Sequence, residues 1–374
     1  MKILIILGTR PEAIKMAPLI QAILKDSHFI LKICVTAQHR EMLDQVLHIF
    51  DIKPDYDLNI MKSKQNLTDI TCRVLNKVQP VLQSFKPDIV LVHGDTTTTM
   101  ASTLAAFYQR ITVGHIEAGL RTGNIYSPWP EEINRKIVSN IARYHFAPTA
   151  YSKKNLQREL IPSNRIFLTG NTIIDSLHWI INKIDNNLKI QKKLSMKYKF
   201  INFNKKILLV TGHRRENMYG GFENICYALV KIATLYFNEI QIIYTIHLNP
   251  KISHIIRNIL SGTKNIFLIK PQNYLSFIYL MYNAYIILTD SGGIQEEATA
   301  LGKPILVMRD TTERPEAIKI GTTILVGTNT KKIIKSVQEL LTNQNKYKKM
   351  SSSSEIFGNG QASHLIINAL KNIR

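Results

Sequence analysis

The sequence lacks the features of several large protein classes. Its 374 residues include three cysteines, which have no metal-ligand spacing and are too few for a disulfide framework. No stretch approaches the roughly 20 apolar residues that span a membrane, and the apolar run at the start is too short for a signal peptide. We therefore expect a cytoplasmic protein with no membrane partner.

Motifs for several kinds of chemistry are also missing. The turn after the first apolar run, Gly8-Thr9-Arg10-Pro11-Glu12, does not match G-x-G-x-x-G, so the sequence lacks the dinucleotide-binding fingerprint. No serine stands in a nucleophile elbow, and no set of histidine, cysteine and aspartate has the spacing of a metal site. We expect no bound metal.

Negative charge is scarce, because 27 acidic residues face 48 lysines and arginines for a net charge of +21. A basic protein invites a nucleic-acid interpretation. The lysines are spread thinly, however, and no basic patch interleaved with aromatic residues is visible. We interpret the charge as a solvated surface that also attracts an anionic substrate, and we expect no nucleic-acid partner. Affinity for bulk nucleic acid that persists at moderate salt would favour the rival interpretation.

The length predicts two domains, and the pattern predicts α/β structure in both. Helical patterns such as 13–25 and 41–50 separate short apolar runs, which implies parallel sheets built from βαβ units. The pattern restarts after residue 172, and the polar segment 185–203 is expected to lead into the second domain. Strands are expected at 2–7, 31–35, 89–92, 113–116, 144–147 and 165–168, then at 207–210, 240–244, 266–269, 286–288, 305–308 and 324–326.

Several apolar runs end on acid–base side chains. Ligands of doubly wound parallel sheets lie at the carboxyl ends of the strands, where this chain places Asp95, Glu117 and His213. Burial beyond an apolar strand would suit Glu117 to proton transfer. Glu131 is expected in a rigid loop, Trp129-Pro130-Glu131-Glu132. Two alternatives stay open: Asp95 is a helix N-cap, or Glu131 lies on a merely solvated loop.

Other turns are suited to an anion. The Ser291-Gly292-Gly293 turn precedes a helical pattern, so its backbone N–H groups can face a phosphate. The pair Glu296-Glu297 lies one turn inside, where carboxylates can accept hydrogen bonds from ribose hydroxyls. Arg10 and Lys15 stand at another helix start, and Arg314 follows a later strand. Alternatively, Arg10 and Lys15 are surface charges and the glycine pair is only a tight turn.

Seven blocks carry a resemblance to a known family. They are Gly8–Lys15, His93–Thr98, His115–Thr122, Pro130–Glu132, Gly212–Asn217, Asp290–Glu297 and Arg309–Glu316. In this order they resemble the bacterial non-hydrolysing UDP-N-acetylglucosamine 2-epimerases, and the resemblance runs from the first strand to the last helix.

The resemblance implies an α/β fold of two Rossmann-like, doubly wound domains in a GT-B arrangement, with the active site in the interdomain cleft. It implies an N-terminal domain of residues 1–170 plus 358–374 and a C-terminal, UDP-binding domain of residues 171–357. It also implies a homodimer.

The resemblance further implies roles for particular residues. Asp95, Glu117, Glu131 and His213 correspond to the family's catalytic group. Its UDP contacts correspond to Arg10, Lys15, Gln272, Phe277, Ser291, Gly292, Gly293, Glu297 and Arg314. Positions tied to a second, activating UDP-N-acetylglucosamine correspond to Gln38, Arg214 and His247. Glu41 and Lys64 depart from the Gln and Arg of some relatives, which leaves that activation open.

The implied reaction interconverts UDP-N-acetylglucosamine and UDP-N-acetylmannosamine for surface polysaccharide such as enterobacterial common antigen. Expelling UDP from C1 avoids a full carbanion at C2 and gives a 2-acetamidoglucal. This path requires acid–base groups at C2 and cations for the diphosphate, and it requires no redox cofactor. The rival enzyme classes are a UDP-sugar transferase of the same architecture and a hydrolysing epimerase that releases the free sugar.

Overall fold

The computed structural model describes residues 1–37, 40–62, 65–212, 220–246 and 249–373. The chain divides into two compact units, unit 1 with residues 1–179 and 357–374, and unit 2 with residues 180–356. No helix of the described residues is long and apolar enough to cross a membrane. The expected division into domains of residues 1–170 plus 358–374 and residues 171–357 stays a prediction.

Unit 1 contains a seven-stranded sheet in the order β3-β2-β1-β4-β5-β6-β7, and every pairing in it is parallel. The central strands are almost entirely apolar because helices cover both faces of such a sheet. The strands are β1 (Lys2–Leu7), β2 (Ile30–Val35), β3 (Tyr56–Asp57), β4 (Ile89–His93), β5 (Thr112–Ile116), β6 (Tyr144–Ala147) and β7 (Ile166–Leu168).

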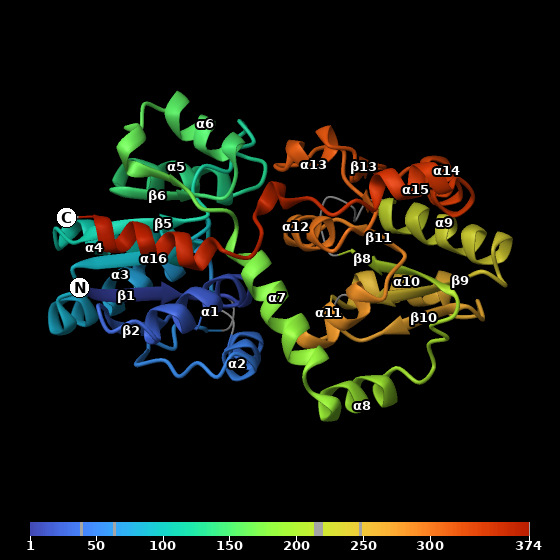
Figure 1. The fold of residues 1–374 in the computed structure, drawn as a ribbon, viewed down its shortest axis with the longest axis horizontal. Coiled ribbons are helices and arrows are strands. Elements are labelled where there is room, and N and C mark those ends of the chain that lie inside the picture. The colour runs from blue at the N-terminus through green and yellow to red at the C-terminus, as the bar shows by residue number, and fades with distance from the viewer. Residues whose placement is uncertain (38–39, 63–64, 213–219, 247–248, 374) are drawn as a thin grey trace. The chain divides into compact units, whose positions relative to one another are not determined.

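The helices of unit 1 connect these strands, and the last helix of the chain returns to pack against the first (Figure 1). They are α1 (Arg10–Leu24), α2 (Arg40–Ile49), α3 (Leu67–Phe85), α4 (Thr97–Tyr108), α5 (Glu131–Ile141), α6 (Ala150–Arg158), the first half of α7 (Thr172–Asp185) and α16 (Ala362–Asn372). A 3₁₀ turn, Ser163–Arg165, precedes β7.

Unit 2 repeats the design with a parallel six-stranded sheet in the order β10-β9-β8-β11-β12-β13. Its strands are β8 (Lys206–Thr211), β9 (Ile240–Thr245), β10 (Ile266–Ile269), β11 (Ile286–Thr289), β12 (Ile305–Val307) and β13 (Thr323–Leu325). Its helices are α8 (Leu188–Lys197), α9 (Gly221–Leu235), α10 (Pro250–Leu260), α11 (Tyr274–Tyr282), α12 (Gly292–Ala300), α13 (Pro315–Lys319), α14 (Thr330–Thr342) and α15 (Gln344–Met350). A 3₁₀ turn, Glu355–Phe357, leads back to unit 1.

Both sheets reverse their strand order at one place, between β1 and β4 in unit 1 and between β8 and β11 in unit 2. The connections that leave such a switch point diverge to opposite faces and expose the carboxyl ends of the two strands, which is where doubly wound sheets bind ligands. Most of the predicted site residues follow β1, β4 and β5 in unit 1 and β8, β11 and β12 in unit 2, whereas Gln272 and Phe277 follow β10.

The parallel α/β architecture expected from the sequence is confirmed, with strand ends shifted by a residue or so. One local feature differs, because the two-residue strand β3 is too short to leave a pattern. The polar segment 185–203, for which the sequence leaves a partly helical structure open, contains helix α8, and Asn187 caps its N-terminus with bonds of 3.1 Å from the amides of Lys189 and Ile190.

Three histidines lie buried in neighbouring strands of unit 1. His93, His115 and His145 belong to β4, β5 and β6, and the last two are paired in register. Burial, the largest cause for each, lowers the pKa of His93 and of His145 to about 4 and that of His115 to about 3. All three side chains are therefore neutral at pH 7.

We predict that the protein loses stability as the pH falls from 7 to 5. An unfolded histidine has a pKa near 6.5, so in this window the unfolded chain binds protons that the folded chain does not, and the free energy of unfolding decreases. Each buried histidine should cost on the order of 1–2 kcal/mol at pH 5. Urea unfolding at the two pH values measures the change.

His145→Asn should weaken this pH dependence, whatever its effect on stability at pH 7. The matched control is His364→Asn, because His364 is exposed on α16. An identical pH dependence in the wild type and in His145→Asn would contradict the assignment.

Candidate active site

Glu117 is the most constrained of the predicted acid–base residues. It directly follows β5 and has a left-handed backbone with φ of 65°, a conformation that costs a non-glycine residue about 1–3 kcal/mol. Its side chain is buried, and Oε2 accepts hydrogen bonds from Lys15 Nζ and, at 2.8 Å, from Asn171 Nδ2. His93 Nε2 lies 3.9 Å from the same oxygen. A strained backbone that holds a buried carboxylate against an ammonium marks a candidate functional residue.

Asp95 lies in the turn after β4, where Arg135 holds its carboxylate. Arg135 Nε and Nη2 lie 2.8 and 2.6 Å from Asp95 Oδ2, and Asn134 donates to the Asp95 carbonyl at 2.9 Å. The N-cap of α4 is Thr96, whose hydroxyl accepts from the Thr99 amide at 3.1 Å. The alternative that Asp95 is the cap is therefore wrong, and the structure ties Asp95 to α5 instead.

Glu131 and Glu132 begin α5, so the expectation that they lie in a loop is wrong for both carboxylates. Glu132 is fully buried and accepts from the amides of Thr122 and Gly123 at 3.1 Å each, and it pairs with Arg135 Nη1 at 3.0 Å. Glu132 therefore has a structural role. Glu131 stands at the first position of the helix and is partly exposed.

Glu12 joins the two loops at the switch point of unit 1. Its carboxylate accepts from the amides of Gly8 and Thr9 and from the hydroxyls of Thr96 and Thr99, at 2.7 to 3.0 Å. Burial raises the pKa of Glu12, while the hydrogen bonds from Thr96, Gly8 and Thr99 oppose the rise. Sequence reasoning missed this role, although Thr9-x-x-Glu12 has the spacing of a capping box, which the helix forms. Arg10 and Lys15 are placed by the helix that Glu12 caps.

In unit 2 the glycine turn lies at the start of a nine-residue helix. Ser291 is the N-cap of α12, and Gly292 and Gly293 begin it. A Cβ at Gly292 would lie 2.6 Å from Arg314 Nη1, so only glycine permits the guanidinium to lie against this turn. At Gly293 a Cβ would meet no atom of the described residues within 4 Å. Backbone N–H groups at a helix start with an arginine beside them are suited to a phosphate.

Carboxylates surround Arg314, which is itself buried. Its Nε donates to Glu296 Oε1 at 2.7 Å, and its Nη1 lies 3.4 Å from Glu313 Oε1. Glu296 thus supports the arginine, and a ribose contact of Glu297 stays a prediction. The Glu297 carboxylate accepts from the Tyr274 hydroxyl at 2.7 Å, which fixes its orientation.

The other predicted UDP contacts of unit 2 lie around the start of α11. Gln272 Oε1 accepts from the Tyr198 hydroxyl at 2.9 Å, and Phe277 is partly exposed on the first turns of the helix. Four predicted residues, Gln38, His213, Arg214 and His247, lie outside the described residues. Within the described residues, no group of three histidine, cysteine, aspartate or glutamate side chains is placed to hold a metal ion.

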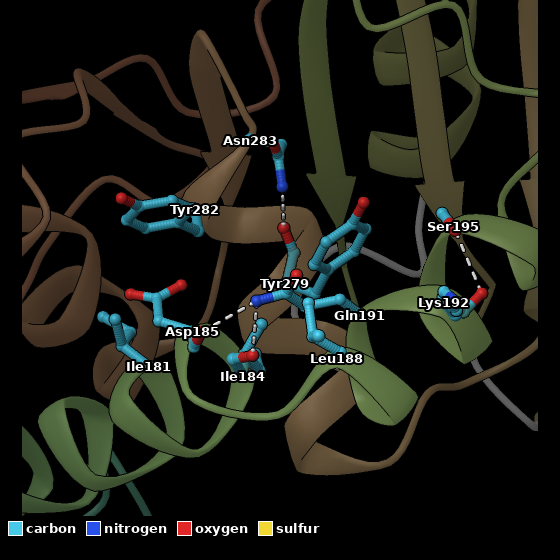
Figure 2. Close-up of a pocket in the computed structure, with 10 residues that line it drawn as sticks. All are labelled: Ile181, Ile184, Asp185, Leu188, Gln191, Lys192, Ser195, Tyr279, Tyr282 and Asn283. Atoms are coloured by element: carbon cyan, nitrogen blue, oxygen red, sulfur yellow. Dashed lines mark hydrogen bonds between the residues drawn. The ribbon is translucent and has the colours of Figure 1, made fainter.

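A pocket of about 460 Å³ lies in unit 2, lined by residues of α7, α8 and α11. Figure 2 shows the residues that line it, among them Gln191, which donates to the carbonyls of Ile184 and Asp185 at 3.0 and 2.9 Å. None of the predicted substrate-binding residues lines this pocket. The predicted site therefore depends on the strand ends and not on this pocket.

Comparisons with known proteins find similarity along nearly the whole chain. The family model described as UDP-N-acetylglucosamine 2-epimerase matches residues 21–371. The chain is 58% identical over 372 residues to a UDP-N-acetylglucosamine 2-epimerase of Yersinia pestis, covering 100% of this chain and 99% of that protein. Among solved structures, the Neisseria meningitidis enzyme bound to UDP-GlcNAc matches with a TM-score of 0.96 at 52% identity, covering 100% of both chains. The Methanocaldococcus jannaschii enzyme in complex with UDP-GlcNAc and UDP matches with a TM-score of 0.85 at 36% identity, covering 99% of both. The two-sheet fold is thus GT-B-like, as expected.

We predict that Arg314→Ala weakens UDP binding. A lost charge-assisted contact is worth about 1.5–3 kcal/mol, which corresponds to roughly a 10- to 150-fold higher Kd in calorimetry. Arg121→Ala is the matched control, because the largely buried Arg121 pairs with Glu159 at 2.6 Å and is not a predicted UDP contact. Both variants should lower the unfolding midpoint, and only Arg314→Ala should lose UDP affinity. An unchanged affinity in Arg314→Ala would remove this residue from the site.

Proposed function

The chain belongs to the UDP-N-acetylglucosamine 2-epimerase family and has that isomerase activity, and from this premise we propose that it inverts C2 by eliminating UDP and adding it back. The observation that carries the proposal is the buried Glu117 carboxylate beside the Lys15 ammonium at the end of β5. A buried carboxylate with an ammonium beside it is suited to proton transfer.

The proposed first step breaks two bonds of the substrate. A base takes the proton from C2, the electron pair of the C–H bond forms the C1–C2 double bond, and the C1–O bond breaks to release UDP. The products are UDP and 2-acetamidoglucal. In the second step an acid delivers a proton to the opposite face of C2, and the diphosphate oxygen returns to C1. No electron is gained or lost overall, so the path needs no redox cofactor.

We assign the proton transfers to a group of side chains that follow strands. Glu117 and Glu131 are the principal acid–base residues, and Asp95 and His213 complete the group. The Lys15 ammonium stabilises the carboxylate form of Glu117. The guanidinium of Arg135 fixes the position of Asp95 and leaves one edge of that carboxylate partly exposed.

We assign the UDP moiety to Arg10, Ser291, Gly292, Gly293, Gln272, Phe277, Glu297 and Arg314. The support is chemical: helix-start N–H groups and arginine for the diphosphate, and oriented carboxylate and amide groups for the nucleoside. Lys15, expected as a further UDP contact, is held against Glu117 in this structure. To bind a diphosphate, the Lys15 ammonium would have to contact it together with Glu117 or leave Glu117.

The assembly and pathway proposals rest on family membership alone. We propose a cytoplasmic homodimer that supplies UDP-N-acetylmannosamine for surface polysaccharide, of which enterobacterial common antigen is an example. We also propose that a second UDP-N-acetylglucosamine activates the enzyme through Gln38, Arg214 and His247, although Glu41 and Lys64 depart from some relatives.

We predict that solvent hydrogen enters C2. In D₂O, UDP-N-acetylglucosamine should give UDP-N-acetylmannosamine with deuterium at C2, because the abstracted proton exchanges with solvent before it returns. NMR of the sugar products measures the exchange. Epimerised product that keeps its original C2 hydrogen would contradict the elimination path, and accumulation of free N-acetylmannosamine would favour a hydrolysing enzyme.

We further predict that Glu117→Gln and Glu131→Gln each lower kcat by roughly 10²–10⁴-fold, the usual contribution of a general acid or base. Glutamine is nearly isosteric, so UDP affinity should hardly change. Glu159→Gln is the control, because Glu159 forms a partly exposed pair with Arg121 away from the strand ends. Near-normal turnover in both variants, with the fold verified by circular dichroism, would move the proton transfers to Asp95 and His213.

A further inference from the structure

We propose that Asn171 is a positioning residue for Glu117, and that the returning C-terminal segment holds Asn171 in place. Asn171 follows β7 and is 2% exposed. Its Nδ2 donates to Glu117 Oε2 at 2.8 Å, the oxygen that also accepts from Lys15. The inference rests on the proposed role of Glu117 and extends it to a residue that no sequence motif singled out.

The amide of Asn171 has a defined orientation. Its Oδ1 accepts from the backbone N–H of Ile173 at 3.1 Å, at the start of α7. A backbone donor, the Ile173 N–H, on one side and a carboxylate acceptor on the other assign the oxygen and the nitrogen of this amide, because only the NH₂ group can donate to Glu117. Helix α7 thereby aims a hydrogen-bond donor at the acid–base residue.

The backbone of Asn171 is held by a segment almost 190 positions later in the chain. Its N–H donates to the Phe357 carbonyl at 2.7 Å. The two chain segments cross at Gly170 and Gly358, which have φ of 81° and 113°. A Cβ on Gly170 would lie 3.1 Å from the Gly358 Cα, and one on Gly358 would lie 3.2 Å from the Gly170 Cα. The crossing therefore requires glycine at both positions.

A second contact fastens the same crossing. Asp175, one turn into α7, accepts from the amides of Ala362 and Ser363 at 3.2 and 2.8 Å, and so caps α16 from outside that helix. Burial raises the pKa of Asp175, while the two amides oppose the rise. With α16 packed on α1, the C-terminal segment reaches both partners of Glu117: Asn171 through the Phe357 carbonyl, and Lys15 through the helix that carries it.

A donor that holds a carboxylate in one place should affect the chemical step more than substrate binding. The groups that face Glu117 include Lys15 from α1 and His93 from β4, and His93 is neutral at pH 7 because burial lowers its pKa to about 4. Asn171 adds a neutral donor, so its loss leaves the local charge unchanged. Replacing it with a carboxylate would set a second negative charge beside the first.

Two substitutions at this position test the proposal in the full-length protein. Asn171→Ala should lower kcat about 10- to 100-fold, as expected for a lost hydrogen bond to a charged group, with KM and UDP affinity within about threefold of the wild type. Asn171→Asp should move the acid limb of the kcat–pH profile upward by about one pH unit, because two neighbouring carboxylates hold a proton more tightly than one. Asn171→Ala adds no charge, so it should leave the acid limb of the kcat–pH profile where it is in the wild type.

The control is Asn265→Ala in unit 2. Asn265 is also a buried asparagine, and its Nδ2 donates to the backbone carbonyls of Ala233 and Ile240 at 3.0 and 3.2 Å. We expect this variant to lower the unfolding midpoint with no shift in the pH profile. The double variant Glu117→Gln/Asn171→Ala should be no slower than Glu117→Gln alone, because the hydrogen bond is already weakened.

The outcomes separate this inference from the proposed function. If Glu117→Gln is severely impaired while folded Asn171→Ala keeps the wild-type kcat, the positioning role of Asn171 is overturned and the proposed function stands. An Asn171→Asp profile that matches the wild type would also overturn it. If Glu117→Gln turns over normally, the proton-transfer role proposed for Glu117 fails, and the positioning role of Asn171 fails with it. If Asn171→Ala does not fold, the pH profile of Asn171→Asp decides.

Discussion

The carboxylate of Glu117 lies in an interior where an unpaired charge would cost several kcal/mol, and distant parts of unit 1 meet to satisfy it. Lys15 comes from the helix after β1, Asn171 from the connection after β7, and His93 from the end of β4. Because the partners come from a helix, a strand end and a connection that are far apart in the chain, one carboxylate ties these segments together. The unfavourable φ of Glu117 persists because those contacts leave it no relaxed alternative.

Buried acidic residues have the same organising role elsewhere in the molecule. Glu12 joins the loops after β1 and β4, Glu132 holds the loop before α5 while it pairs with Arg135, and Glu296 supports Arg314 beside the glycine turn of unit 2. In each case the supporting carboxylate lies beside a residue with a proposed chemical role. Acidic residues are few in this basic chain, but several of the buried ones lie near the strand ends.

The fold and part of the site could be predicted from the sequence. Apolar runs of four to six residues separated by helical patterns indicate parallel strands, and the residue after each run falls at the ligand-binding edge because of that topology. This reasoning located Asp95, Glu117 and the Ser291 turn. It could not locate Asn171 or Arg135, because their roles depend on contacts between segments far apart in the chain. It also placed Glu131 and Glu132 in a loop, since the start of α5 lacks a capping side chain on Pro130.

Positional isotope exchange tests the central claim most directly. UDP-N-acetylglucosamine with ¹⁸O in the bridge between C1 and the β-phosphorus is incubated with the wild type and with Glu117→Gln, and ³¹P NMR follows the label. If Glu117 takes part in a step that breaks the C1–O bond, the wild type should scramble the label into non-bridging positions, and the variant should scramble it at least 100-fold more slowly while still binding UDP. Epimerisation by the wild type without scrambling, or scrambling by the variant at the wild-type rate, would contradict the account.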